Sequence, residues 1–333
     1  MTAPEDRPTS KGLPATAWVI AGRRAWHGFL RHRGLDSAAA LTFFGTLATF
    51  PVALAGVALL SIALGRDGAK ETLLAFVSEI AEPATVEAVQ GPLGELLTVT
   101  NPWLALGVGI VVALWTMSGY ATAFGRAVNT VYEVQEGRQI WKFRGLMMLL
   151  AVFLIVGFGA VIALLLSTPR AIAAIGITEP WVTVWAFARW PILVVVVALI
   201  IAVLYYATPN VRHDRFRWVS YGALFAMIVW ALATAAFYAY IAVVGQYDKV
   251  YGWLGGAIVL LLWLYLTNLV LVLGAEVDAE GVRLRQLAAG MPAEDVVQLP
   301  MRDTRRNLML ARQRAADQAA SAQFREVHAP DED

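Results

Sequence analysis

Six long apolar blocks divide the chain, and nearly all charged residues lie in the segments between them. An α-helix needs roughly 20 mainly apolar residues to cross the hydrocarbon core of a bilayer. Each block meets that length, so the pattern predicts spans at about 38–64, 103–124, 145–166, 181–207, 219–244 and 253–275. The polar sequence is too short to cover six buried helices in a soluble protein. We therefore expect an all-α membrane protein, a bundle of six transmembrane helices.

Composition agrees with this fold class and excludes several chemistries. Hydrophobic residues make up 59% of the chain and charged residues 15%, whereas soluble domains are nearer a quarter charged. The formal net charge of +1 gives no electrostatic reason to expect nucleic acid as a partner. The chain has no cysteine, which excludes disulfides, thiol catalysis and cysteine-ligated metals.

Lys and Arg residues alternate between rich and poor segments along the chain. Outside the spans the successive segments hold 6, 2, 4, 1, 3, 1 and 8 of them. Because segments rich in Lys and Arg stay in the cytoplasm, both chain ends are expected there. An odd number of spans would break the alternation. The first apolar run begins near Ala38, and we expect it to act as an uncleaved targeting signal.

The same pattern divides the chain into four parts. We expect a disordered N-terminus at 1–14, an amphipathic cytoplasmic helix at 15–37, the six-helix transmembrane domain at 38–281, and a polar, partly disordered cytoplasmic tail at 282–333.

The amphipathic helix before the first span carries the residues expected to anchor it in the membrane interface, Trp18, Arg23, Arg24 and Trp26. Tryptophan suits the headgroup level, and arginine suits anionic lipid. A short helix packed on the cytoplasmic ends of the spans is an equal alternative.

The first external loop, at about 65–102, is the longest between spans. Its apolar residues recur at helical spacing among acidic ones, so we expect one or two amphipathic helices, broken at Pro83 and Pro92. The loop is either a lid over a cavity or a solvated connecting segment.

Arg189 is the clearest ionisable residue inside a span, about 12 Å from the external end of the fourth helix. Charged groups at such depth are costly, so each is a candidate for function. Pro191 follows closely and favours a kink. Arg189 is either an anion site open to the outside or a side chain snorkelling between Trp185 and Trp190.

Polar residues inside other spans add weaker candidates. Thr42 and Thr46 share one face of the first span, where they either join helices or line a substrate path. Arg126 and Asn129 share the cytoplasmic end of the second span, where Arg126 either binds a phosphate or is an ordinary positive-inside residue.

The last two spans contribute aromatic and acidic candidates. Tyr247 and Tyr251 lie in the short loop between these spans, as substrate contacts or as part of an aromatic belt. Glu276, Asp278 and Glu280 end the sixth span, where acids oppose the helix dipole. They should therefore have basic partners, and the expected ones are Arg126, Arg212 and Arg215.

An ordered set of short segments resembles the YihY/BrkB family of bacterial inner-membrane proteins, a family once labelled ribonuclease BN. The segments are Ala38–Phe44, Phe50–Pro51, Ala127–Asn129 with Tyr132, Leu204–Asn210, Gly222–Leu224, Tyr247–Gly252, Leu262–Tyr265 and Leu273–Glu276. The resemblance covers about 20–285. It implies a six-helix protein of the bacterial inner membrane. Family members are linked to transfer-RNA processing, serum resistance or export of lipid-like envelope precursors.

Three functions remain open. The first is transport or handling of an anionic lipid or envelope precursor. The second is a membrane scaffold without transport. The third, a ribonuclease, is disfavoured because none of the four histidines stands in metal-ligand spacing with acids. We expect no enzyme activity, no metal and no cofactor. The expected partners are membrane lipids, anionic ones included, and further copies of the chain, but not nucleic acid.

Overall fold

The computed structural model describes residues 14–80, 101–174, 176–212, 220–244 and 253–328, with isolated positions between 86 and 97. All regular structure in these ranges is helical, apart from one isolated bridge between Val211 and Met301. The six predicted spans are confirmed as α2 (Gly34–Ile80), α4 (Pro102–Val131), α5 (Ile140–Leu166), α7 (Trp181–Ala207), α8 (Tyr221–Val244) and α10 (Trp253–Ala288).

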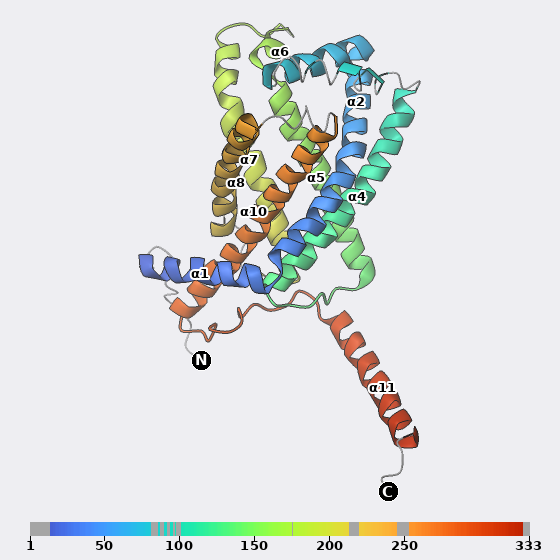
Figure 1. Ribbon diagram of the computed structural model, residues 1–333, viewed down its shortest axis with the longest axis vertical. Helices are drawn as coiled ribbons and strands as arrows, with labels where there is room; N and C mark the ends of the chain where they lie inside the picture. The colour runs from blue at the N-terminus through green and yellow to red at the C-terminus, as the bar shows by residue number, and fades with distance from the viewer. Residues whose placement is uncertain are drawn as a thin grey trace, which may run out of the picture.

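Within the described ranges, three further helices lie outside the spans. Helix α1 (Ala15–Arg31) crosses one end of the bundle, and α11 (Arg305–His328) projects away from the same end (Figure 1). Helix α6 (Pro169–Ala174) lies at the other end. We call the first end the terminal face; it comprises α1, residues 132–139, residues 208–212 and the segment 289–304. The opposite end is the distal face.

Helix α2 continues beyond its span and bends at Gly65. The φ of Gly65 is +75°, a left-handed conformation that glycine adopts without steric cost. The part that follows, residues 66–80, runs across the distal face (Figure 1). Ala69 is buried there with Leu97, and Leu73 and Leu74 pack against them. The amphipathic helix expected in this loop is therefore present up to Ile80, while Pro83 and Pro92 lie outside the described residues.

Helix α10 is central to the packing of helices near the terminal face. It packs against α1, α2 and α8, while α5 lies between α4 and α7. The contact with α8 is close because Gly222 has no side chain: a Cβ there would lie 2.5 Å from Cβ of Asp278. Helix α4 begins at Pro102, behind an Asn101 cap that accepts hydrogen bonds from two backbone N–H groups.

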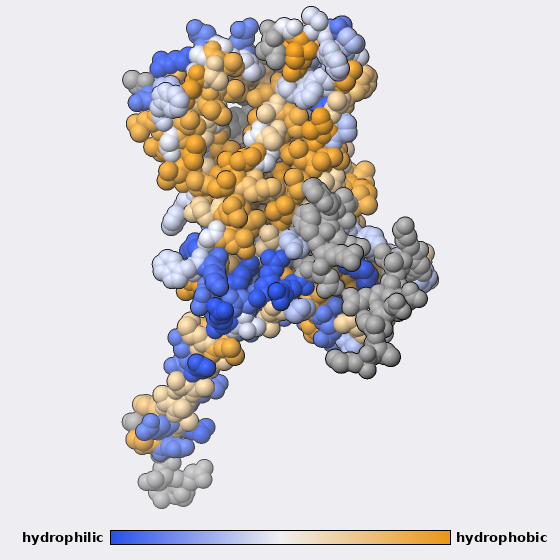
Figure 2. All heavy atoms as spheres, turned by 180° about the vertical axis from the view of Figure 1, so that it is seen from behind, coloured by the Kyte–Doolittle hydropathy of each residue, from blue (hydrophilic) through white to orange (hydrophobic). Residues whose placement is uncertain are grey.

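Burial is unevenly divided between the two halves of the bundle. In α5 the last buried residue is Leu154, in α7 the first is Ile200, and in α8 the last described as buried is Ala226. All three limits place the buried part toward the terminal face. Apolar side chains cover the middle of the molecule, with polar groups at both ends (Figure 2). The spans are thus closely packed at the terminal face, while the distal halves of α5, α7 and α8 leave their side chains accessible.

Candidate functional site

The acids that end α10 meet partners from other elements at the terminal face. Glu276 is only 3% exposed, and its Oε1 accepts a hydrogen bond from Nδ1 of His32, 2.8 Å away. His32 follows α1, so this contact joins α1 to α10. Gly28 makes the approach possible, since a Cβ there would lie 2.7 Å from Oε2 of Glu276.

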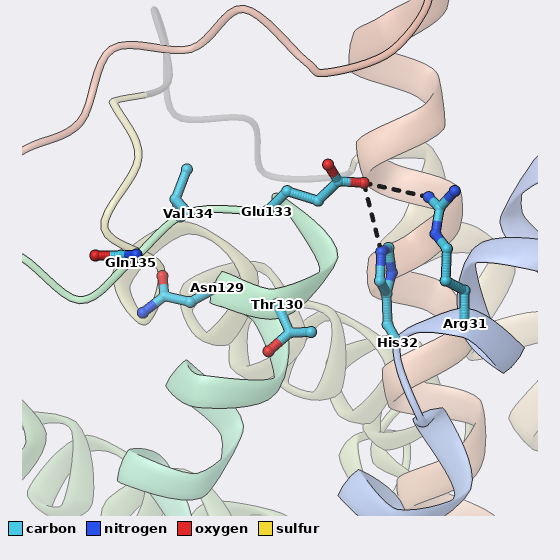
Figure 3. Close-up of a pocket in the computed structure, with 7 residues that line it drawn as sticks. All are labelled: Arg31, His32, Asn129, Thr130, Glu133, Val134 and Gln135. Carbon is cyan, nitrogen blue, oxygen red and sulfur yellow. Dashed lines mark hydrogen bonds and ion pairs between the residues drawn. The ribbon is translucent and has the colours of Figure 1, made fainter. Parts of the chain in front are cut away.

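A shallow hollow of about 510 Å³ opens beside this pair (Figure 3). Glu133 stands on its wall, with Oε1 3.2 Å from Nη2 of Arg31 and 3.5 Å from Nε2 of His32. The figure shows both basic side chains pointing toward the Glu133 carboxylate. The lining residues are Arg31, His32, Asn129, Thr130, Glu133, Val134 and Gln135.

The next two acids of α10 are also paired. Glu280 lies 3.2 Å from Nε of Arg24 and accepts from Nε of Arg283 at 3.0 Å. Asp278 accepts from the hydroxyl of Tyr132 at 3.4 Å and from the backbone N–H of Gly222 at the same distance. The prediction that these acids have partners is confirmed, but the partners differ from those expected. The unfavourable interaction of these acids with the helix dipole is offset by basic residues of α1 and of α10 itself. Arg126, one of the expected partners, is exposed.

A second polar cluster joins the ends of α4 and α7. Asn129 accepts the backbone N–H of Asn210 at 2.7 Å and donates to Glu136 at 3.0 Å. Glu136 in turn holds Arg138 through two hydrogen bonds of 2.7 Å. Arg138 donates onward to the backbone carbonyl of Thr208, 2.6 Å away. Each side chain of the cluster is hydrogen-bonded, as buried polar groups usually are, although Nη1 of Arg138 has no partner among the described residues. The cluster is therefore a structural joint.

The segment after α10 crosses the terminal face as a strap, residues 291–304. Arg283 donates to the backbone carbonyls of residues 293, 294 and 295, and Gln286 exchanges two hydrogen bonds with the backbone of Gln298. Arg302 donates to the carbonyl of Val211 at 2.7 Å and to that of Tyr206. The strap therefore closes over the ends of α7 and α10.

A smaller polar group lies deeper, inside the spans. Asn268 accepts from the hydroxyl of Tyr120 at 2.9 Å and donates to Thr42 at 3.2 Å. Tyr120 stacks on Phe124, which stacks on Tyr205. Three spans, α2, α4 and α10, thus meet at one buried amide. Such contacts join helices in membranes, which is one of the two interpretations given for Thr42.

Charge and burial shift three pKa values at the terminal face. The hydrogen bond to Glu276 raises the pKa of His32 above 6.5, against the opposing effect of burial. Burial raises the pKa of Tyr132 and lowers that of Arg302. His32 is the group among these whose charge can change near neutral pH.

The other predicted candidates lie apart from this site. Arg189 is half-buried on α7, its guanidinium 5.1 Å from the Trp190 ring, and its Nε has no hydrogen-bond partner among the described residues. Thr46 bonds to its own helix at the carbonyl of Thr42. Tyr247, Tyr251 and Arg215 lie outside the described residues.

The expected anchors of α1 divide between two faces. Trp18 packs edge-on against Tyr221, with ring centroids 4.7 Å apart, and Arg24 pairs with Glu280. Arg23 and Trp26 are exposed. The helix thus packs on the bundle along one side and leaves another side free, with the exposed apolar residues Val19, Ile20, Trp26 and Leu30.

Sequence reasoning missed the role of His32, and also Asn268, Arg138 and Arg302. His32 was considered only as a metal ligand; in the part of the chain that the structure describes, no three His, Asp or Glu side chains are placed to hold a metal ion. The sequence feature that points to His32 is the negative charge of Glu276, which has no basic partner nearby in the sequence, together with a histidine directly before the first span. Spacing alone could not join them, because 244 positions separate the two residues.

The fold and the polar terminal face define an all-α integral membrane protein with six spans. A family model described as virulence factor BrkB matches residues 25–295. The chain therefore belongs to the BrkB family.

Three relatives illustrate the similarity. The ribonuclease-like protein YfkH of Bacillus subtilis is 30% identical over 256 residues, covering 74% of this chain and 90% of YfkH. A UPF0761 membrane protein of Azotobacter vinelandii is 29% identical, covering 76% of this chain and 61% of its own length. The UPF0761 membrane protein IL2447 of Idiomarina loihiensis is 27% identical, covering 66% and 76%. No solved structure matches the chain.

Proposed function

We propose that the protein transports or handles an anionic lipid or an anionic envelope precursor. The observation that carries the proposal is the uneven packing of the bundle. Among the described residues of α5, α7 and α8, the buried ones lie toward the terminal face, where α1 and the strap cover the spans. Transporters that work by alternating access open to one side of the membrane at a time, so one end of the bundle is closed in each state. The terminal face is, on this account, the closed end.

Arg189 is the proposed contact for the anionic headgroup. It lies in the loosely packed half of α7, and its Nε has no hydrogen-bond partner among the described residues. An arginine presents several donors in one plane, which suits a phosphate group. The Trp190 ring beside it provides an apolar surface next to the charge.

The terminal face is proposed to be cytoplasmic, in the inner membrane of a bacterium. The segments at that face hold 6, 4, 3 and 8 Lys and Arg residues, against 2, 1 and 1 at the distal face. Because the chain has no cysteine, single cysteines can test this directly. A cysteine at Gln323 should react with an impermeant maleimide only after permeabilisation, and one at Thr178 should react in intact cells; the reverse pattern would contradict the orientation.

Lipid movement is testable in vesicles with the purified full chain. The probe is phosphatidylglycerol carrying an NBD label on its acyl chain, and dithionite reports how fast the label moves between leaflets. Vesicles with the protein should lose the protected signal faster than empty vesicles do, and faster with this anionic probe than with NBD-phosphatidylethanolamine.

The matched variants separate the headgroup contact from general charge. Arg189→Ala should reduce movement of the anionic probe at least several-fold. Lys142→Ala removes an exposed positive charge at the terminal end of α5 and should leave the rate unchanged. Equal rates with and without protein would refute transport and favour the alternative, a scaffold that assembles with other chains.

A further inference from the structure

His32 lies between two carboxylates that differ in access to water. Its Nδ1 is 2.8 Å from Oε1 of Glu276, and its Nε2 is 3.5 Å from Oε1 of Glu133. A carboxylate only accepts hydrogen bonds, so Nδ1 carries a proton in this contact. The second ring nitrogen is then the one that can gain or lose a proton.

The two carboxylates differ in how far they are exposed to solvent. The Glu276 side chain is 4% exposed, whereas that of Glu133 is 35% exposed and lines the hollow in Figure 3. His32 also lines the hollow, so solution at the terminal face reaches its ring from the side of Glu133. The inner carboxylate is out of reach of solvent unless α1 moves.

Other charged groups face the pair from each neighbouring element. Glu280, one turn further along α10, adds negative charge near Glu276, and Arg31 of α1 adds positive charge near both residues. Glu280 is itself held by Arg24 and Arg283. The pair formed by His32 and Glu276 thus stands inside a network that joins α1 to α10 at two points.

We propose that His32 is a proton-binding site whose occupancy sets how firmly α1 is held on α10. With the proton bound, an imidazolium faces the buried Glu276 carboxylate, and the two opposite charges hold the helices together. Without it, a neutral imidazole remains, and only a hydrogen bond between neutral donor and charged acceptor is left.

Release of the proton from His32 involves only Glu133 and water. The N–H bond at Nε2 breaks, and its proton passes to the Glu133 carboxylate and from there to water in the hollow. The electron pair stays on Nε2, so the ring becomes neutral while Nδ1 keeps its proton toward Glu276. Reversal of the same steps loads the site from the terminal-face solution.

This site would make opening of the terminal face in the transport proposed above depend on the pH at that face, and in that respect it rests on that proposal. The described structure corresponds to the loaded state, with α1 seated and the terminal face closed. Release of the proton to the terminal side loosens α1 and allows that face to open.

Nitrogen-15 NMR of labelled histidines in the purified full chain tests the site without any substrate. The His32 signal, assigned by its loss in His32→Asn, should titrate with a midpoint above about 6.5. Glu276→Gln should lower that midpoint, and Glu133→Gln should lower it less, because Glu133 contributes the smaller attraction. The exposed His27 of α1 provides the control signal, and its chemical shift at one fixed pH should be the same in all variants. An unchanged His32 midpoint in Glu276→Gln would overturn the proposal.

Spin labels on cysteines at Gly22 and Ala288 test the motion, since both positions are exposed, one on α1 and one at the end of α10. Their distance distribution should be narrow below the His32 midpoint and broader above it. In Glu276→Gln it should be broad at both pH values. A distance distribution that does not change with pH, in the chain with His32 and Glu276 intact, would refute control of α1 by the proton.

The outcomes also separate this inference from the proposed transport. If both pH measurements succeed but no lipid moves in vesicles, the proton site stands and the transport proposal falls. If lipid moves but the His32 midpoint is the same in the native chain and in Glu276→Gln, transport stands and the proton site is wrong.

Discussion

The backbone N–H of Asn210 donates to the side-chain oxygen of Asn129, 2.7 Å away, and so ties the end of α7 to the end of α4. Asn210 also donates from its amide to the carbonyls of Gln135 and Asp303. This one buried residue after α7 therefore links the end of α4, the loop after α4 and the strap. The terminal face is held shut by such joints between elements distant in sequence.

Removal of the Asn129 side chain should destabilise this joint. Asn129→Ala leaves the buried Asn210 N–H without its partner, which costs about 1–3 kcal/mol, and removes one of the two hydrogen bonds that Oε2 of Glu136 accepts. The apparent melting temperature in detergent, followed by tryptophan fluorescence, should fall. The neighbouring Thr130→Ala, at an exposed position, should change it little. Equal melting temperatures for Asn129→Ala and the native chain would contradict the joint.

Two glycines of α1 offer a matched comparison. A Cβ at Gly28 would meet the Glu276 carboxylate at 2.7 Å, whereas one at Gly22 would meet nothing within 4 Å. Gly28→Ala should push α1 away from α10 and expose it to limited proteolysis. Gly22→Ala should protect α1 as well as the native residue does, or better, because alanine favours the helix. Equal cleavage of the two variants would show that α1 does not seat as described.

The contribution of His32 to stability should depend on pH in a defined direction. Its pKa is raised in the folded protein, chiefly by the hydrogen bond to Glu276. Its stabilising effect is therefore fully present below the ordinary pKa near 6.5 and is lost as pH rises through the raised value. The difference in melting temperature between the native chain and His32→Asn should shrink from acid to alkaline pH. A difference that grows with pH would exclude the ion pair.

The ribonuclease-like name of YfkH motivates a direct assay. The acids of α10 are paired with His32, Tyr132, Arg24 and Arg283, which leaves them engaged in structure rather than available to a substrate. We expect no RNA cleavage by the purified chain with Mg²⁺, Mn²⁺ or Zn²⁺. Metal-dependent cleavage that is lost in Glu276→Gln or Asp278→Asn would overturn this expectation.

Much of the fold follows from the sequence because a bilayer imposes a strong local pattern. Each span is set by its own apolar length, and the kink at Gly65 occurs where the apolar block of α2 ends and Arg66 begins. The terminal face does not follow in this way. Its contacts join residues far apart in the chain, as in Glu276 with His32 or Arg302 with Val211.

The candidate residues show the same division. Asn129, Thr42 and Glu276 were identified because each is a polar group in an apolar context, a signal visible in one segment. Their partners Asn210, Asn268 and His32 were not identified, because a partner is set by packing and not by local pattern. The arginines expected as partners of these acids share with them only the side of the membrane, and that does not specify the distance between them.

The most direct test of the account is to lock the terminal face and follow lipid movement. Cysteines in place of Arg24 and Glu280 stand at one of the two points that join α1 to α10, in a chain with no other cysteine. A short bifunctional thiosulfonate should join them, stop movement of NBD-phosphatidylglycerol in vesicles, and release it again after reduction. Undiminished movement with the crosslink in place would contradict opening of this face.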